Sequence, residues 1–131
     1  MAKANQVQYF NVAIEKQMGF AAIVQTDNTL RLSGVVSVDE QMQVVGAGDM
    51  AAQITQVYDI IEKVLAMNQA TFANVVNEMI FVTDIAALAE AASVRAARYA
   101  DCAPPASTAV QVSALFFPEA MIEVQVTAIL D

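Results

Sequence analysis

The chain has 131 residues, of which 57% are hydrophobic, and its formal net charge is −8. This length fits a single domain, residues 1–131, that can bury roughly two thirds of the surface exposed by the unfolded chain. The six basic residues are scattered along the sequence. Because phosphate binding needs a basic stripe, we do not expect nucleic acid as a partner.

The residue types that are absent or rare in the sequence narrow the possible chemistry further. There is no histidine, which removes the commonest general base and the commonest metal ligand, so we expect no metal site. The one cysteine, Cys102, cannot form an intrachain disulfide. The longest uncharged run, residues 102–118, contains three prolines and cannot be a transmembrane helix. The first residues lack the apolar core of a signal peptide, so we expect a cytoplasmic protein with no membrane association.

Three strands are expected in the first third of the chain. Residues 7–14 alternate weakly, as a strand does, and residues 18–24 form a loop followed by a second strand. Residues 29–34 form a third strand that ends on glycine, with Arg31 and Ser33 on one face. A long connection, residues 35–48, leads to the next element.

Two helices and three further strands are expected in the rest of the chain. Residues 49–68 show the apolar i, i+3, i+4 pattern of a buried helix face, and Asp49 is the expected N-cap. Residues 84–99 form the second helix, with Asp84 as its cap. Arg95 and Arg98 fall in its last turns, where cations complement the helix dipole or are simply solvated. The strands are expected at residues 75–83, 107–115 and 121–130.

This order, β-β-β-α-β-α-β-β, predicts an α+β domain of two layers, a mixed sheet of about six strands packed on two helices. Such a sheet has one face that no helix covers. Because the chain has more apolar surface than a small monomer hides, we expect another subunit to cover that face.

Five local patterns occur in the order and spacing of a known family. They lie at residues 32–36 (Leu-Ser-Gly-Val-Val), 52–57, 82–84, 104–106 (Pro-Pro-Ala) and 122–124. Together they resemble the RidA family, also called the YjgF or L-PSP endoribonuclease family, and the resemblance covers about residues 18–130.

The resemblance implies a chorismate-mutase-like fold and a homotrimer, in which the sheets face inward and small-molecule clefts lie at the subunit interfaces. It implies a hydrolase, a deaminase that converts reactive enamines or imines to a keto acid and ammonia. It also implies that no metal or organic cofactor takes part.

Several residues of the family's site have counterparts here. Ser33 and Gly34 match a turn that helps to hold the ligand, and Glu123 matches a carboxylate that orients water or relays a proton. Phe20 lies near the place of a tyrosine and would form an apolar wall. A structural partnership with an interface hydroxyl or arginine is the alternative role for Glu123.

The arginine that grips the substrate carboxylate in active relatives is replaced by Ser107, with Thr108 beside it as a second hydroxyl contact. Removing one partner from a bidentate Arg–carboxylate contact costs roughly 2–4 kcal/mol, and a serine does not replace the charge. Arg31 is a candidate for a displaced anion clamp, with a surface or interface ion pair as its alternative role. Either the ligand is not an α-carboxylate, or another cation holds it, or the deaminase activity is lost.

Two functions therefore stay open. One is a cofactor-independent enamine or imine deaminase with a non-standard substrate, and the other is a non-catalytic metabolite-binding or regulatory trimer. With Glu123 retained and no compensating cation, the pocket favours a neutral or cationic ligand. An RNA-acting protein is a third possibility, which the net charge and the missing histidine oppose.

Overall fold

A mixed sheet of seven strands carries the fold of residues 5–131, the part of the chain that this computed structural model describes. The strand order is β1-β2-β3-β7-β5-β6, and β4 also pairs with β7. All neighbours are antiparallel except β5 and β6, which run parallel. The strands are β1 (Gln6–Gln8), β2 (Ile23–Thr26), β3 (Thr29–Leu32), β4 (Val35–Val36), β5 (Val75–Val82), β6 (Ala106–Gln111) and β7 (Ile122–Ile129).

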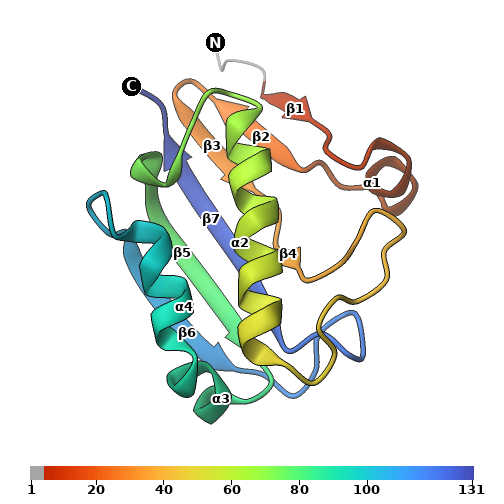
Figure 1. The fold of residues 1–131 in the computed structure, drawn as a ribbon. Coiled ribbons are helices and arrows are strands. Elements are labelled where there is room, and N and C mark those ends of the chain that lie inside the picture. The colour runs from red at the N-terminus through yellow and green to blue at the C-terminus, as the bar shows by residue number, and fades with distance from the viewer. Residues whose placement is uncertain (1–4) are drawn as a thin grey trace.

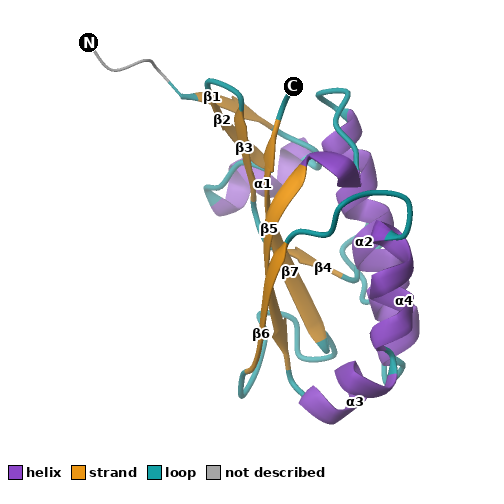
Figure 2. Ribbon diagram, turned by 90° about the vertical axis from the view of Figure 1, so that its left-hand side faces the viewer, coloured by secondary structure: helices purple, strands orange, loops and turns teal. Residues whose placement is uncertain are grey.

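Helices α2, α3 and α4 cover one face of this sheet, whereas α1 lies beside the β1 edge (Figures 1 and 2). The predicted two-layer α+β architecture is confirmed. No helix among residues 5–131 combines the length and the apolar character that crossing a membrane requires. The helices are α1 (Val12–Met18), α2 (Met50–Ala66), α3 (Ile85–Glu90) and α4 (Ala92–Ala96), with short 3₁₀ turns η1 (Phe72–Asn74) and η2 (Ala97–Tyr99).

The two central elements follow their sequence patterns closely. In α2, five residues of the apolar stripe are completely buried, namely Ile54, Val57, Tyr58, Ile61 and Leu65. Asp49 caps this helix as predicted, because its side chain accepts a hydrogen bond from the Ala52 amide at 3.1 Å. In β7, every second residue from Ile122 to Ala128 is buried against the helices, which leaves the alternate residues on the other face.

The predicted strand at residues 7–14 is wrong beyond its first residues. Strand β1 ends at Gln8, and the chain turns into helix α1. The Glu15 carboxylate accepts a hydrogen bond from the Phe10 amide at 2.8 Å and so fixes the entry to the helix. Gly19 ends α1 in the left-handed conformation, with φ of 83°, which a glycine adopts without steric cost.

Two other predicted boundaries also shift. The helix predicted at residues 84–99 begins at its Asp84 cap, but it is interrupted at Ala91 and continues as α4 and η2. Strand β6 ends at Gln111, four residues before the predicted end at 115. The Gln111 side chain accepts a hydrogen bond from the Ile85 amide at 2.9 Å, which ties the end of β6 to the start of α3.

A buried glutamate, Glu78 on β5, joins the helix layer to the sheet. Its side chain is completely buried, and its two oxygens accept four hydrogen bonds. Tyr58 of α2 and Tyr99 of η2 each donate from 2.9 Å, Ser107 of β6 donates from 3.1 Å, and Arg95 of α4 donates through Nε. Burial and the neighbouring Glu78 charge raise the pKa of both tyrosines far above the usual value, so both hydroxyls remain donors.

This network corrects the dipole or solvent role predicted for Arg95. Its guanidinium pairs with Glu78 and lies 5.1 Å from the centre of the Tyr99 ring, and its side chain is only 23% exposed. Arg98 is no more exposed, at 20%, but its ion pair is more superficial, because the side chain of its partner Asp59 is 48% exposed. The two arginines therefore belong to very different electrostatic environments.

The contrast between these arginines predicts different stability losses. Replacing Arg95 by Met leaves the buried Glu78 without its cationic partner and should lower the free energy of unfolding by about 3 kcal/mol. Replacing Arg98 by Met removes a solvent-screened pair and should cost less than about 1 kcal/mol. Urea denaturation of both variants measures the difference, and equal losses would contradict the structural role given to Glu78.

Candidate functional site

An interruption between β3 and β4 creates the candidate site. The Ser33 amide donates to the Ala22 carbonyl at 2.9 Å, and the Ser33 hydroxyl donates to the Ala21 carbonyl at 2.6 Å. These bonds hold residue 33 toward the start of β2, and pairing with β7 resumes only at Val35, which lies opposite Val124. The turn at Ser33 and Gly34 thus opens a gap beside β7.

The Glu123 carboxylate lies directly over Gly34. A β-carbon placed on Gly34 would be 2.1 Å from Glu123 Oε2, so any larger residue would force the carboxylate to move. Gly34 is not among the residues with positive φ, so this close approach, and not backbone conformation, explains the glycine. Gly34 therefore sets where the carboxylate lies.

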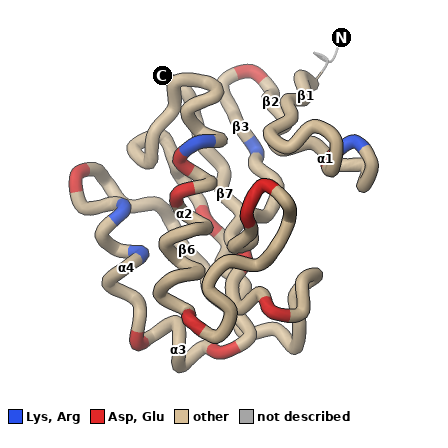
Figure 3. Tube along the Cα trace, turned by 45° about the vertical axis from the view of Figure 1, so that its right-hand side comes forward, with Lys and Arg blue, Asp and Glu red and all other residues tan. Residues whose placement is uncertain are grey.

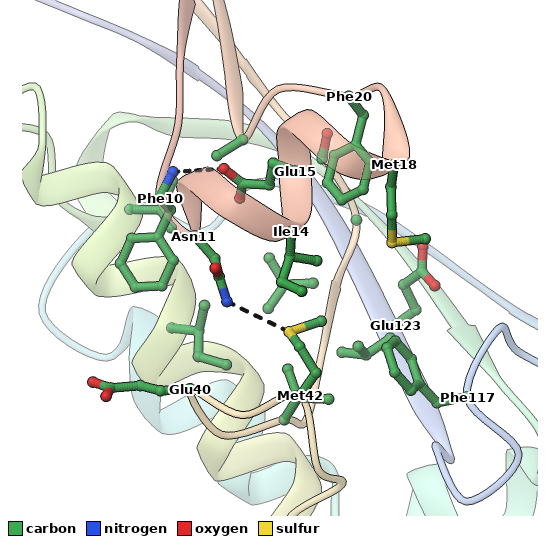
Figure 4. A pocket seen from close by; sticks show the side chains of 18 of the residues that line it. Phe10, Asn11, Ile14, Glu15, Met18, Phe20, Glu40, Met42, Phe117 and Glu123 are labelled. Carbon is green, nitrogen blue, oxygen red and sulfur yellow. Dashed lines mark hydrogen bonds between the residues drawn. The ribbon is translucent and has the colours of Figure 1, made fainter.

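Glu123 and Gly34 belong to the lining of an open groove of about 880 Å³. Figure 4 shows the groove with Glu123 and Phe117 at one end and Phe10 and Glu40 at the other, and with α1 along one side. Most of the wall is apolar, with contributions from α1, the loop after it, β4 and the loop before β7: Ile14, Met18, Phe20, Val35, Phe116 and Phe117.

Glu123 differs from the other carboxylates of the lining. It is half-buried and forms no hydrogen bond or ion pair with any of residues 5–131, and burial raises its pKa above the usual carboxyl value. Glu15 accepts from the Phe10 amide, Asp39 accepts from the amides of Gln41 and Gln43, and Glu40 is exposed. Glu123 is thus the half-buried acid with lone pairs left for a ligand or a water molecule.

The structure brings together four of the residues singled out in the sequence. Phe20, Ser33, Gly34 and Glu123 all line the groove. The Ser33 hydroxyl already donates a hydrogen bond to the Ala21 carbonyl. Of this turn, only the backbone and the space above Gly34 are therefore left to contact a ligand.

The other three predicted site residues lie elsewhere in the chain's own fold. Ser107 faces the helices, because its hydroxyl donates to Glu78. Thr108 shares the open face with Glu123, but β5 separates its strand from β7, so the two backbones are about 10 Å apart. Arg31 lies opposite Thr127, four residues or about 13 Å along β7 from Glu123.

Sequence reasoning missed the part of the groove that α1 builds. Ile14 and Met18 line it with the i, i+4 spacing of one helix face, but the predicted strand at residues 7–14 concealed that spacing. Phe116, 74% exposed, and Phe117 form an edge-to-face ring pair with ring centroids 5.4 Å apart. Two adjacent aromatic residues before a proline were the available signal in the sequence. Within residues 5–131, no cluster of His, Cys, Asp or Glu has the arrangement of a metal site.

The unpartnered Glu123 predicts a stability gain on neutralisation. Its pKa is higher in the folded state than in the unfolded state. The free energy of unfolding therefore falls as the pH rises above the pKa of the unfolded carboxyl group, and the loss is complete above the folded pKa. Glu123→Gln should therefore be more stable than the parent at about pH 7, and equal to it below about pH 4, where both side chains are neutral. Urea denaturation at both pH values tests this, with the exposed Glu90→Gln as the control that should show no such difference.

The Gly34–Glu123 contact predicts a coupled pair of substitutions. Gly34→Ala should cost about 1 kcal/mol in the parent, because the flexible carboxylate must shift, and less than about 0.5 kcal/mol in a Glu123→Ala background. A double-mutant cycle of unfolding free energies measures the coupling. An unchanged cost in the second background would mean that the close approach does not hold Glu123 in place.

Comparison with known proteins assigns the chain to a family. The family model described as Endoribonuclease L-PSP matches residues 10–130. The chain is 31% identical over 114 residues to a RutC family protein of Leuconostoc mesenteroides, covering 83% of this chain and 85% of that protein. It is 39% identical over 84 residues to protein DfrA of Myxococcus xanthus, a match that spans 64% of this chain and less than two thirds, 63%, of DfrA.

A solved structure supports the same family assignment. Rv2704 of Mycobacterium tuberculosis, a member of the YjgF/YER057c/UK114 family, is 27% identical and superimposes with a TM-score of 0.81, over 97% of this chain and all of the other. The match to the family model covers residues 10–130, a range that contains all five patterns found in the sequence. This chain belongs to the endoribonuclease L-PSP family, the RidA or YjgF family that those patterns predicted.

Proposed function

We propose that the protein is a cofactor-independent hydrolase that binds a small imine or enamine in the groove and releases ammonia from it, with Glu123 as the catalytic group. The observation that carries this proposal is the half-buried, unpartnered Glu123 carboxylate over Gly34 at one end of an apolar groove. A carboxylate whose pKa is raised by burial is a stronger base than an ordinary carboxylate and can return the proton it accepts, which is the property required of a general acid–base group.

The reaction needs only one water molecule and one proton carrier. Glu123 accepts a proton from the water while the water oxygen bonds to the carbon of the protonated imine, and the electron pair of the C=N double bond moves to nitrogen. The protonated Glu123 then returns its proton to the nitrogen of the tetrahedral adduct. Glu123, now deprotonated again, takes the hydroxyl proton of the adduct as the carbonyl forms, the C–N bond breaks, and ammonia leaves. An enamine enters this sequence after protonation at carbon has converted it to the imine.

The apolar wall contributes by positioning the substrate and reducing the water around the reacting carbon. Met18, Phe20 and Phe117 lie near the Glu123 end of the groove in Figure 4. A restricted approach lets one held water compete with bulk solvent, and holding the reactants together lowers the entropic part of the barrier.

We further propose that the protein assembles as a homotrimer through the helix-free face of the sheet. That face carries the exposed apolar residues Val7, Val110 and Ile129, which favour contact with another protein surface. Thr108 and Arg31 lie on the same face, so this assembly would bring them to subunit contacts. Light scattering of the full-length chain measures the number of subunits.

The second candidate function is ligand binding without turnover. It is favoured by Ser107, whose hydroxyl serves Glu78 and not a ligand in the groove. Ammonia release separates the two functions, because a binding protein retains the ligand without releasing ammonia.

Catalysis by Glu123 predicts a specific loss of activity. With an imine generated in place by an amino-acid or amine oxidase, ammonia release should fall by at least about a hundredfold in Glu123→Gln, because amide nitrogen and oxygen cannot carry the proton. The Glu90→Gln control should match the parent. The parent rate should also fall on acidification at a pH above the usual carboxyl range, because the base form is required and burial raises the pKa of Glu123. A Glu123→Gln variant with the parent rate would remove the proposed role.

A further inference from the structure

The charges around the groove are predominantly negative. The lining contains the carboxyl side chains of Glu15, Asp39, Glu40 and Glu123, but its only cationic side chain among the described residues is that of Lys63. The whole chain carries a net charge of −8. A low-dielectric wall with one sign of charge concentrates ligands of the opposite sign.

The other cations that the structure describes are engaged or distant. Lys16 lies over the Tyr9 ring, Arg95 is paired with Glu78, and Arg98 is paired with Asp59. Arg31 does not line the groove, and Lys63 is an exposed side chain of α2, whereas Glu123 is on β7. Figure 3 shows these basic positions as separate points along the described trace. Within the described residues of one chain, Lys63 is therefore the one cationic side chain that lines the groove, and it extends from a different element than Glu123.

Glu123 itself requires a donor from the ligand. Its oxygens accept no hydrogen bond from residues 5–131, and the neighbouring Ser33 hydroxyl already donates to Ala21. A half-buried carboxylate without donors is unfavourable, and an N–H group that carries a positive charge is the partner that relieves this most. A second carboxylate at the same place would add like-charge repulsion.

The walls suit an apolar or aromatic body attached to that nitrogen. Met18, Phe20 and Phe116 line the groove and remain 48%, 41% and 74% exposed, so a ligand can bury them. Aromatic ring faces also attract organic cations. Carboxylate, aromatic rings and thioether together form a surface for an ammonium or iminium group with an apolar substituent.

We propose that the groove selects organic cations, namely primary ammonium or protonated imine groups on an aromatic or branched apolar body that carries no carboxylate, with Glu123 as their counter-ion. This inference rests on the proposed function for the location of the site and deepens it by naming the substrate class. The iminium form is the electrophile that the proposed hydrolysis needs, so the same charge pairing brings the reactive carbon to the catalytic carboxylate.

Three probes with the same ring and a similar chain test the selection: 2-phenylethylammonium, 2-phenylethanol and 3-phenylpropionate. Isothermal titration of the full-length chain at low ionic strength should give a Kd for the ammonium at least about tenfold lower than that for the carboxylate, with the alcohol between them. In Glu123→Gln the ratio of the carboxylate Kd to the ammonium Kd should fall at least about threefold. In the Glu90→Gln control this ratio should stay as in the parent. Raising the salt to about 0.5 M should also weaken it.

Two results would overturn the inference. One is carboxylate binding as tight as ammonium binding, or no ammonium binding on the order of 10 mM. The other is a preference that persists unchanged in Glu123→Gln, which would place the selecting charge elsewhere. Phe20→Ala supplies a second check, because loss of the apolar wall should weaken the ammonium and the alcohol by similar factors while the charge preference is kept.

These results are distinguishable from failure of the proposed function. Cation-selective, Glu123-dependent binding without any ammonia release would support the ligand class and overturn the hydrolysis. Glu123-dependent hydrolysis of a carboxylate-bearing imine, without a preference among the three probes, would support the hydrolysis and overturn the ligand class.

Discussion

The burial of one carboxylate, that of Glu78, is the constraint on which the packing of the helices depends. A glutamate on the helix face of the interior strand β5 is tolerable only if every lone pair it presents has a donor. Those donors come from α2, α4, η2 and β6, so satisfying a single side chain fixes four elements relative to β5. An apolar residue would pack there without such demands, whereas Glu78 specifies which side chains must surround it.

A second glutamate of the sheet, the half-buried Glu123, has the opposite environment. Glu123 lies on β7 with its carboxylate over Gly34, without a donor, and with its pKa raised by burial. The fold thus satisfies one glutamate completely and leaves the other unsatisfied at the edge of a groove. Since an unpartnered carboxylate costs stability, its presence is more easily understood as a requirement of binding or catalysis than of folding.

Sequence reasoning located the elements whose signal is local and failed where the signal depends on a distant partner. Helix α2 was predictable because its apolar period and its Asp49 cap lie within the same 20 residues. Helix α1 was not, because Val12 and Ile14 also fit an alternating strand, and the turn that decides the matter is set by Glu15 and Gly19. Phe20, Ser33, Gly34 and Glu123, which the order of the family's patterns singled out together, line one groove in the structure.

The importance of Glu78 could not be inferred from its place in the strand. An exposed strand glutamate and a buried one look alike in sequence, and the four donors to Glu78 are 17 to 29 residues away. A glutamate with strongly apolar neighbours was the available signal, and it was used only for Glu123. The partner of Arg95 was missed for the same reason, because the helix dipole offered a sufficient local explanation.

The Glu78 network also changes what the serine at position 107 means. Considered alone, Ser107 stands where active relatives have an arginine, and restoring that arginine would be the obvious way to recover a carboxylate-binding pocket. In the structure, Ser107 and Arg95 share the same oxygen of Glu78, so a second guanidinium at position 107 would have to compete with Arg95 for it. The serine is therefore coupled to the buried glutamate, and a change at 107 acts on the packing of α4 before it acts on any ligand. For this reason the charge preference of the groove is better tested at Glu123, where no structural partner has to be broken.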